Sequence, residues 1–92
     1  MYMLAVYDIV DNKRRNRVAG TLKDYGVRVQ KSKFEIDPSS AGFRELQRRV
    51  AEVIEPSEDG IKYIPLCESC RARIEFIGQG FYVDPDEEFY IL

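Results

Sequence analysis

The chain has no histidine, only two cysteines among its 92 residues, and no long apolar run. The absence of histidine excludes a histidine-assisted serine or cysteine nucleophile and a histidine-ligated metal ion. Any general base must then be a carboxylate, a lysine, a tyrosine or metal-bound water. Carboxylate and metal chemistry are therefore the reactions that this composition favours.

No apolar run approaches the roughly 20 residues that a bilayer-spanning helix requires. The opening segment, MYMLAVYDIV, also lacks the basic region and the cleavage site of a secretory signal peptide. Apolar residues make up 45% and charged residues 33% of the chain, enough for one core and a solvated surface. We expect a soluble, cytoplasmic protein that does not associate with membranes and folds as one domain over residues 1–92.

The two cysteines, Cys67 and Cys70, form a single CxxC motif. A structural zinc site usually takes four ligands from one chain, or two such pairs across a dimer, so this motif is weak evidence for zinc. Two reduced, partly buried thiols, a redox pair and a metal ion shared between two chains all remain open.

Positive charge is concentrated in one part of the chain, although the net charge is only −2. Residues 13–33 contain eight Lys and Arg residues against the single acid Asp24, a net charge of +7, which leaves −9 for the rest. This asymmetry predicts a positive face suited to phosphate groups, although an ordinary solvated helix face would show the same pattern.

The first 26 residues predict a strand followed by a helix. Residues 2–10 are rich in Val, Ile, Leu and Tyr, which is typical of a central strand covered on both faces. Asp11 or Asn12 is suited to cap the following helix. Apolar residues then recur at helical spacing as far as Tyr25, and we expect Gly26 to end the helix.

Extended structure is predicted over residues 27–36, but the alternation of apolar and polar residues slips around 31–33. No Gly, Asn or Pro marks a turn there, so a tight hairpin and a single bulged strand both fit. Residues 37–40 offer caps to a second helix, whose apolar stripe ends before Pro56. A turn then leads to another strand over residues 60–66.

This order of elements is typical of an α+β, ferredoxin-like βαββαβ sandwich, in which both helices cover one face of an antiparallel sheet. A further strand is predicted at 74–77. Strand-like pieces at 81–83 and 89–92 have no place in the minimal sheet. We expect residues 79–92 to form an additional C-terminal strand, an arm that pairs with another chain.

Asp8 lies near the end of the otherwise apolar first strand, where a carboxylate is costly to bury. Either it caps the following loop or pairs with Arg14 or Arg15, or it holds a cation. One Asp cannot select Mg²⁺, which requires six oxygen ligands in near-octahedral geometry. If Asp8 lies near the axis of a two-fold dimer, its symmetry mate supplies the second carboxylate, and waters and a substrate phosphate complete the shell.

Arginines near Asp8 are candidates for nucleic-acid binding, because a series of cations can follow a phosphate backbone and makes binding sensitive to salt. These arginines are Arg14, Arg15, Arg17 and Arg28. Tyr7 and Phe34 could stack on a base, but aromatic residues in strands belong more often to the core.

The chain closely resembles the family of CRISPR-associated protein two, the small nuclease-like partner of the CRISPR adaptation integrase. The resemblance rests on the run YDIVDNKRRNRVAGTLKDYGVRVQKSKFEI, followed by a helix, a Tyr-Ile-Pro-Leu strand and a late Gly-x-Gly. Its most specific parts are Tyr7-Asp8, the Asp-x-x-Arg-Arg-x-Arg opening of the first helix, and the segment from Tyr25 to Phe34. It extends over nearly the whole chain.

The resemblance implies a ferredoxin-like homodimer with metal-dependent endonuclease activity on single-stranded RNA or double-stranded DNA. By position it implies Asp8 as the ligand of Mg²⁺ or Mn²⁺ at the dimer axis, with Tyr7 beside it as a second catalytic residue. It implies nucleic-acid binding or support of cleavage for Arg15, Arg17, Arg28 and Phe34. The segment from Phe81 onward corresponds to the part that pairs across the dimer or docks on the integrase subunit, CRISPR-associated protein one.

Two features depart from the family pattern. Lys33 stands where many relatives have an apolar residue before the phenylalanine, which alters packing or adds a phosphate contact. The Cys67-Cys70 pair occurs in only part of the family, so no family role transfers to it.

The leading prediction is a CRISPR adaptation protein, acting in spacer acquisition, that binds duplex DNA beside the integrase and hydrolyses phosphodiester bonds at a metal ion shared by two Asp8 side chains. The main alternative is a non-catalytic DNA-binding scaffold that bridges integrase subunits, with Asp8 in a structural role. A toxin-like single-strand ribonuclease of the same fold rests on analogy alone. Ligand, orienting group and structural acid look alike in one sequence, so these alternatives stay open.

Overall fold

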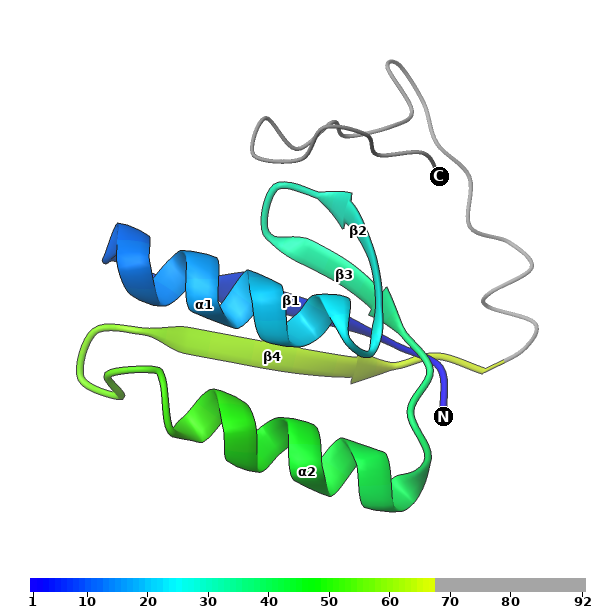
Figure 1. The fold of residues 1–92 in the computed structure, drawn as a ribbon. Helices are drawn as coiled ribbons and strands as arrows, with labels where there is room; N and C mark the ends of the chain where they lie inside the picture. Colours follow the sequence, from blue (N-terminus) through cyan, green and yellow to red (C-terminus); the bar gives the residue numbers. More distant parts are fainter. Residues whose placement is uncertain (68–92) are drawn as a thin grey trace.

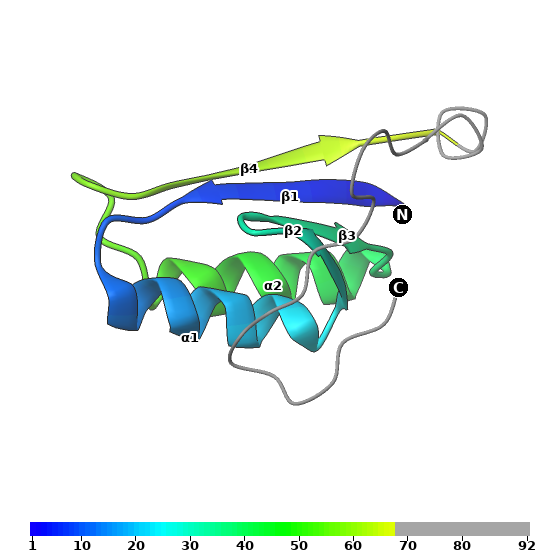
Figure 2. The same ribbon diagram turned by 90° about the horizontal axis from the view of Figure 1, so that it is seen from above.

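The computed structural model describes residues 1–67. In chain order the elements are β1 (Met3–Asp8), α1 (Asn12–Lys23), β2 (Gly26–Gln30), β3 (Lys33–Ile36), α2 (Ser40–Ala51) and β4 (Gly60–Pro65). The strands form one antiparallel sheet in the order β2-β3-β1-β4. Both helices lie on the same side of this sheet (Figures 1 and 2). The predicted α+β, ferredoxin-like βαββαβ arrangement is confirmed. The predicted strand at 74–77, the arm at 79–92 and Cys70 lie outside the described residues.

Each helix begins at a capping side chain that the sequence predicted. The Asp11 carboxylate accepts a hydrogen bond of 2.9 Å from the backbone N–H of Arg14 at the start of α1. The Ser39 hydroxyl accepts one of 3.0 Å from Gly42 at the start of α2. Because each cap satisfies a backbone N–H that has no partner within the helix, it fixes the residue at which the helix begins. Asp11, and not Asn12, is the cap of α1.

The sequence predicted that Gly26 ends α1, and this is wrong. The helix ends at Lys23 with Asp24 as its C-cap, and Gly26 is the first residue of β2. A Cβ atom placed on Gly26 would lie 1.9 Å from the carbonyl oxygen of Glu35 on the neighbouring strand. Glycine is required here because β2 and β3 approach too closely for any side chain at this position.

Residues 26–36 form a hairpin, which is one of the two alternatives left open by the sequence, and the single bulged strand is wrong. β2 and β3 are separate antiparallel strands, and their register shifts between Arg28 and Gln30. The turn of the hairpin lies beside the end of β1, because the backbone N–H of Tyr7 donates to the carbonyl of Ser32 at 3.1 Å. The sequence pattern slips because Val27 lies on the exposed side of β2, at 46% exposure, whereas its neighbour Arg28 is buried opposite Phe34.

The core lies between the sheet and the two helices. Every second residue of β1 points into it, and Met3, Ala5 and Tyr7 are all buried. The other side chains with almost no exposure are Val18, Leu22, Phe34, Ile36, Leu46 and Val50. Successive side chains along each strand point to opposite faces of the sheet, so the strand residues between the core residues face away from the helices.

We call the side of the sheet that neither α1 nor α2 covers the open face. It carries Leu4, Val6, Asp8, Val27, Lys33, Glu35, Lys62 and Ile64. The sequence predicted that β1 is covered on both faces, and this is wrong for residues 1–67. Leu4 and Val6 are only half-buried and Asp8 is exposed, because both helices pack on the opposite side. Neither helix in this part of the chain is long and apolar enough to cross a bilayer.

Candidate functional site

Asp8 is the last residue of β1, and its carboxylate is exposed on the open face. It makes no hydrogen bond or ion pair with any residue from 1 to 67. The structural alternatives weighed from the sequence are therefore wrong: Asp11 caps α1, Arg14 pairs with other acids, and Arg15 donates to loop carbonyls. Exposure removes the cost of burying this carboxylate, and its oxygens are accessible from solvent.

A hollow of about 350 Å³ lies at the Asp8 end of the open face. Its lining residues are Val6, Tyr7, Asp8, Gly60, Ile61 and Lys62. Gly60 is the direct partner of Asp8 across β1 and β4. A Cβ atom on Gly60 would meet nothing within 4 Å, so the missing side chain leaves open space directly beside the carboxylate.

Tyr7 precedes Asp8 in the sequence, but its side chain lies on the opposite face of the sheet. The ring is buried at 4% exposure. Its hydroxyl accepts a hydrogen bond of 3.1 Å from Arg28 Nη2 and donates one of 3.3 Å to the carbonyl of Lys31. This follows from the alternation of a β-strand, in which neighbouring residues cannot point the same way. The structure therefore does not bring the two predicted catalytic side chains together.

Arg28 and Phe34 lie inside the molecule with Tyr7, and we call these three residues the buried cluster. The Arg28 guanidinium is centred 5.3 Å from the centroid of the Phe34 ring, a cation–π distance. Arg28 is 7% exposed and Phe34 is 0% exposed. Their predicted contacts with nucleic acid remain predictions, and this placement favours a role in core packing.

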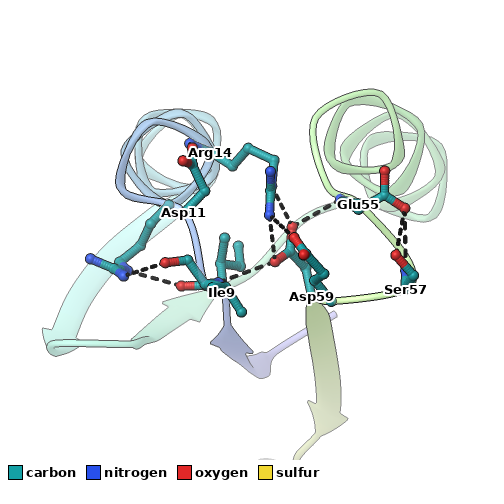
Figure 3. A network of polar contacts seen from close by, with 9 residues as sticks. Ile9, Asp11, Arg14, Glu55, Ser57 and Asp59 are labelled. Carbon is teal, nitrogen blue, oxygen red and sulfur yellow. Dashed lines mark hydrogen bonds and ion pairs between the residues drawn. The ribbon is translucent and has the colours of Figure 1, made fainter.

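Arg14 joins the start of α1 to the loop before β4, as Figure 3 shows. Its Nε lies 2.7 Å from Asp59 Oδ2, and its Nη2 lies 2.8 Å from Glu58 Oε2. The Asp59 side chain is fully buried and also accepts from the backbone N–H groups of Val10 and Glu55. The Arg14 hydrogen bonds, aided by these N–H donors, lower the pKa of Asp59 to about 2. We call Arg14, Glu58 and Asp59 the loop clamp, because they hold two distant segments together.

The other two predicted arginines on α1 differ in their surroundings. Arg15 donates to the carbonyls of Ile9 and Val10 at 3.1 and 3.2 Å and to Asn12 Oδ1 at 2.6 Å. It therefore holds the loop between β1 and α1. The Arg17 side chain is exposed and has no polar partner within residues 1–67, beside Arg49 in a hollow between α1 and α2. Of the predicted phosphate-binding arginines, it alone is uncommitted, and it lies in the helix layer rather than on the open face.

Sequence reasoning missed two features. It assigned no function to Asp59, which resembles any other loop acid until its fully buried position is known. It also did not predict which face of the sheet Lys62 lies on, and it left open whether Lys33 alters packing or contacts phosphate. Both lysines lie on the open face, flanking Val6 on β3 and β4. The alternation around Phe34 was a usable signal for Lys33, because a buried neighbour directs position 33 outward.

Within residues 1–67, the donors around Asp8 are too few to hold a metal ion on their own. In the described part of the chain, no group of three or more His, Cys, Asp or Glu side chains lies close enough to hold one. Asp8 offers exposed carboxylate oxygens, which suit Mg²⁺ or Mn²⁺, but Mg²⁺ requires a six-oxygen shell. The residues fit a hard cation only where a second carboxylate and a phosphate join Asp8.

Comparison with known proteins agrees with the fold. The family model for CRISPR associated protein Cas2 matches residues 1–74. The chain is 37% identical to CRISPR-associated endoribonuclease Cas2 1 of Chloroflexus aurantiacus, with 100% of both chains covered. It is 34% identical to CRISPR-associated endonuclease Cas2 2 of Thermus thermophilus, across 87% of this chain and 83% of that one.

The fold also matches a solved structure of a related protein. The crystal structure of Streptococcus pyogenes Cas2 at pH 6.5 superposes with a TM-score of 0.79 and 32% identity, covering 85% of this chain and 100% of that one. The resemblance seen in the Tyr7-Asp8 strand end and the arginine-rich helix is thus supported by sequence and by structure. The chain belongs to the Cas2 family of CRISPR-associated proteins.

Proposed function

We propose that this protein is a homodimeric nuclease of CRISPR adaptation that hydrolyses phosphodiester bonds at a metal ion held between two Asp8 side chains. The observation that carries the proposal is the exposed Asp8 carboxylate, free of partners in residues 1–67 and beside an open hollow. A structural acid would have a partner, as Asp59 has. Relatives that are named endoribonuclease and endonuclease support the same class of reaction.

The apolar residues of the open face support the homodimer. Val27 is 46% exposed and Ile64 is 36% exposed, and they lie on the same face as Leu4 and Val6. A second copy that covers this face would remove apolar surface from water, worth about 25 cal/mol per Å². In a two-fold arrangement, a residue near the axis meets its own symmetry mate, which is how a second Asp8 would arrive.

The two Asp8 carboxylates would hold Mg²⁺ or Mn²⁺, with water and a substrate phosphate as further ligands. When bound, such an ion supplies an activated water at neutral pH and stabilises negative charge on the phosphate. Asp8 would hold the ion at the end of β1, and Gly60 would leave room for the phosphate beside it. No histidine is needed for this chemistry.

The test compares the wild-type chain with Asp8→Asn on labelled single-stranded RNA and duplex DNA, with and without Mg²⁺, across a range of pH. Mutating an outer-shell partner of a metal ligand typically costs about 10- to 100-fold, so we expect loss of Asp8 itself to cost about 100-fold or more. Glu45→Gln is the matched control, because Glu45 is an exposed acid on α2, on the other side of the sheet.

Metal-dependent cleavage that is unchanged in Asp8→Asn would refute the proposal. The protein would then be better explained as a DNA-binding scaffold between subunits of CRISPR-associated protein one. Comparison of the RNA and DNA substrates decides which polymer is cleaved.

A further inference from the structure

We propose that Lys33 and Lys62 form a phosphate-binding pair that flanks the Asp8 hollow and holds the nucleic-acid backbone during cleavage. The inference rests on the proposed function, in which Asp8 lies at the reacting phosphate. It adds the residues that hold the negatively charged nucleic-acid backbone close to the Asp8 carboxylate. Neither lysine belongs to the arginine set that the sequence predicted for this purpose.

The strand register brings the two lysines together. Val6 on β1 pairs directly with Lys33 on β3 and with Lys62 on β4. Residues that are directly opposite in antiparallel strands share a face, so both lysines project from the open face on either side of Val6. Their strands are two strand spacings apart, roughly 10 Å. Asp8 lies two residues further along β1, and Lys62 itself lines the hollow beside it.

Electrostatics favours cations at this place. A phosphate backbone that approaches Asp8 meets a negative charge, and like charges in contact are unfavourable. Three of the predicted arginines are committed elsewhere: Arg14 in the loop clamp, Arg15 to loop carbonyls and Arg28 in the buried cluster. Arg17 lies in the helix layer. Within residues 1–67, Lys33 and Lys62 are the uncommitted cations on the same face as Asp8.

The open face divides into two halves along β1. The half at the Asp8 end holds Lys33 and Lys62, neither of which has a hydrogen bond or ion pair in the described part of the chain. The other half holds Leu4, Val27 and Ile64, together with Glu35, which accepts a hydrogen bond from the Tyr2 hydroxyl. A second copy that packs on the apolar half, with Asp8 near the two-fold axis at its border, would leave Lys33 and Lys62 at the edge of the interface, where a phosphate backbone can approach Asp8. Long lysine stems allow the ammonium groups to reach neighbouring phosphates.

The test measures salt-dependent binding in the full-length chain carrying Asp8→Asn, in EDTA, so that cleavage does not interfere. The probes are a short labelled single-stranded RNA and a duplex DNA of the same sequence. Lys33→Gln and Lys62→Gln are each expected to lower the slope of log K against log salt by about 0.7 on RNA and 0.9 on duplex DNA. The double variant should lose about twice as much, and Lys→Arg at either position should restore the slope.

Arg44→Gln is the control, because it removes one exposed positive charge from α2 on the opposite side of the sheet. The proposal is overturned if both lysine variants keep the wild-type slope, or if Arg44→Gln lowers the slope equally. It is also overturned if the lysine variants change the sedimentation of the protein instead of its binding. Asp8-dependent cleavage is measured separately in the otherwise wild-type chain, so failure of the lysine pair and failure of the nuclease function give different results.

Discussion

The two faces of β1 differ in what their side chains are bound to. On the covered face, Met3 and Ala5 pack in the core, and Tyr7 exchanges hydrogen bonds with Arg28 and the hairpin turn. On the open face, Asp8 ends the same strand with no partner in residues 1–67. Side chains from one strand thus serve two purposes. The covered face stabilises the fold, and the open face presents groups that can bind something else.

The same contrast separates the basic residues. Arg14, Arg15 and Arg28 have the charge expected of a nucleic-acid contact, yet each is used to hold the protein together. In the described part of the chain, Lys33 and Lys62 have no such commitment, and they lie opposite Val6 on the same open face as Asp8. Residue type alone therefore does not identify the phosphate-binding groups, because position relative to the sheet decides which cations are available.

The largest effect is expected for removing the Phe34 ring. Phe34→Ala creates a cavity beneath Arg28 and should lower the free energy of unfolding by about 3–5 kcal/mol. Val6→Ala, on the open face of the neighbouring strand, should cost about 1 kcal/mol or less because Val6 is only half-buried. Urea denaturation at low protein concentration measures both. Equal losses would contradict the difference between the faces.

A smaller but pH-dependent effect is expected at Asp59. Because the pKa of Asp59 is lowered from 3.8 to about 2, its ionised form stabilises the fold above about pH 4, and this contribution is lost as the pH falls through 2. Asp59→Asn should lower the melting temperature at neutral pH by on the order of 10 °C and flatten the acid side of the stability profile.

Circular dichroism melts of the wild type and Asp59→Asn between pH 2 and 7 test this prediction. Glu58→Gln is the control, because Glu58 pairs with the same arginine from an exposed position, with 54% side-chain exposure. A parallel pH profile for wild type and Asp59→Asn would show that the loop clamp does not depend on the Asp59 charge.

Tyr7→Phe is expected to show that Tyr7 and Asp8, although adjacent in the sequence, have different roles on the two faces of the sheet. It removes one acceptor from Arg28 and should cost about 1–2 kcal/mol of stability. Cleavage should fall less than about threefold at temperatures where the variant is folded, while Asp8→Asn loses cleavage and keeps its stability. The paired measurement of melting temperature and cleavage rate distinguishes these outcomes. A large loss of cleavage in folded Tyr7→Phe would restore Tyr7 as a catalytic residue.

The smallest effect on stability is expected at Gly60. Gly60→Val places a side chain in open space directly beside Asp8. The free energy of unfolding should therefore change by no more than about 0.5 kcal/mol. Cleavage should nevertheless fall several-fold, because the hollow beside the carboxylate is partly filled. Gly20→Val offers a comparison, since a Cβ atom on Gly20 also meets nothing within 4 Å but lies on α1. Valine and glycine differ in helix propensity by only about a few tenths of a kcal/mol, so Gly20→Val should change the stability of α1 little.

Local patterns predicted most of the fold. The caps Asp11 and Ser39, and the apolar periodicity of both helices, depend on neighbours within a few residues and are visible in the sequence. Gly26 was misjudged because its requirement comes from the carbonyl of Glu35 on another strand. The covering of β1 was misjudged for residues 1–67 for a similar reason: a run of apolar residues does not show whether the layer that covers it comes from these residues or from elsewhere.

The candidate site was predictable only in part. The position of Asp8 near the strand end followed from the pattern, and its open-face exposure follows from the alternation with Tyr7. The partners of the arginines were not predictable. Arg14, for example, pairs with Asp59 across a sequence separation of 45 residues. Pairing at such distances depends on the finished fold, and one sequence gives no measure of it.

The loop clamp also bears on the order in which the chain folds during synthesis. The β2–β3 hairpin is local and can pair as soon as it leaves the ribosome, with β1 then joining β3. One edge of β1 stays unpaired until β4 is complete, since the register between them ends at Pro65. The Arg14–Asp59 ion pair closes the loop that carries α2, and Asp59 emerges directly before β4. A nascent chain stalled before residue 60 would therefore expose a strand edge suited to aggregation, and would present Asp8 without the strand that completes its pocket.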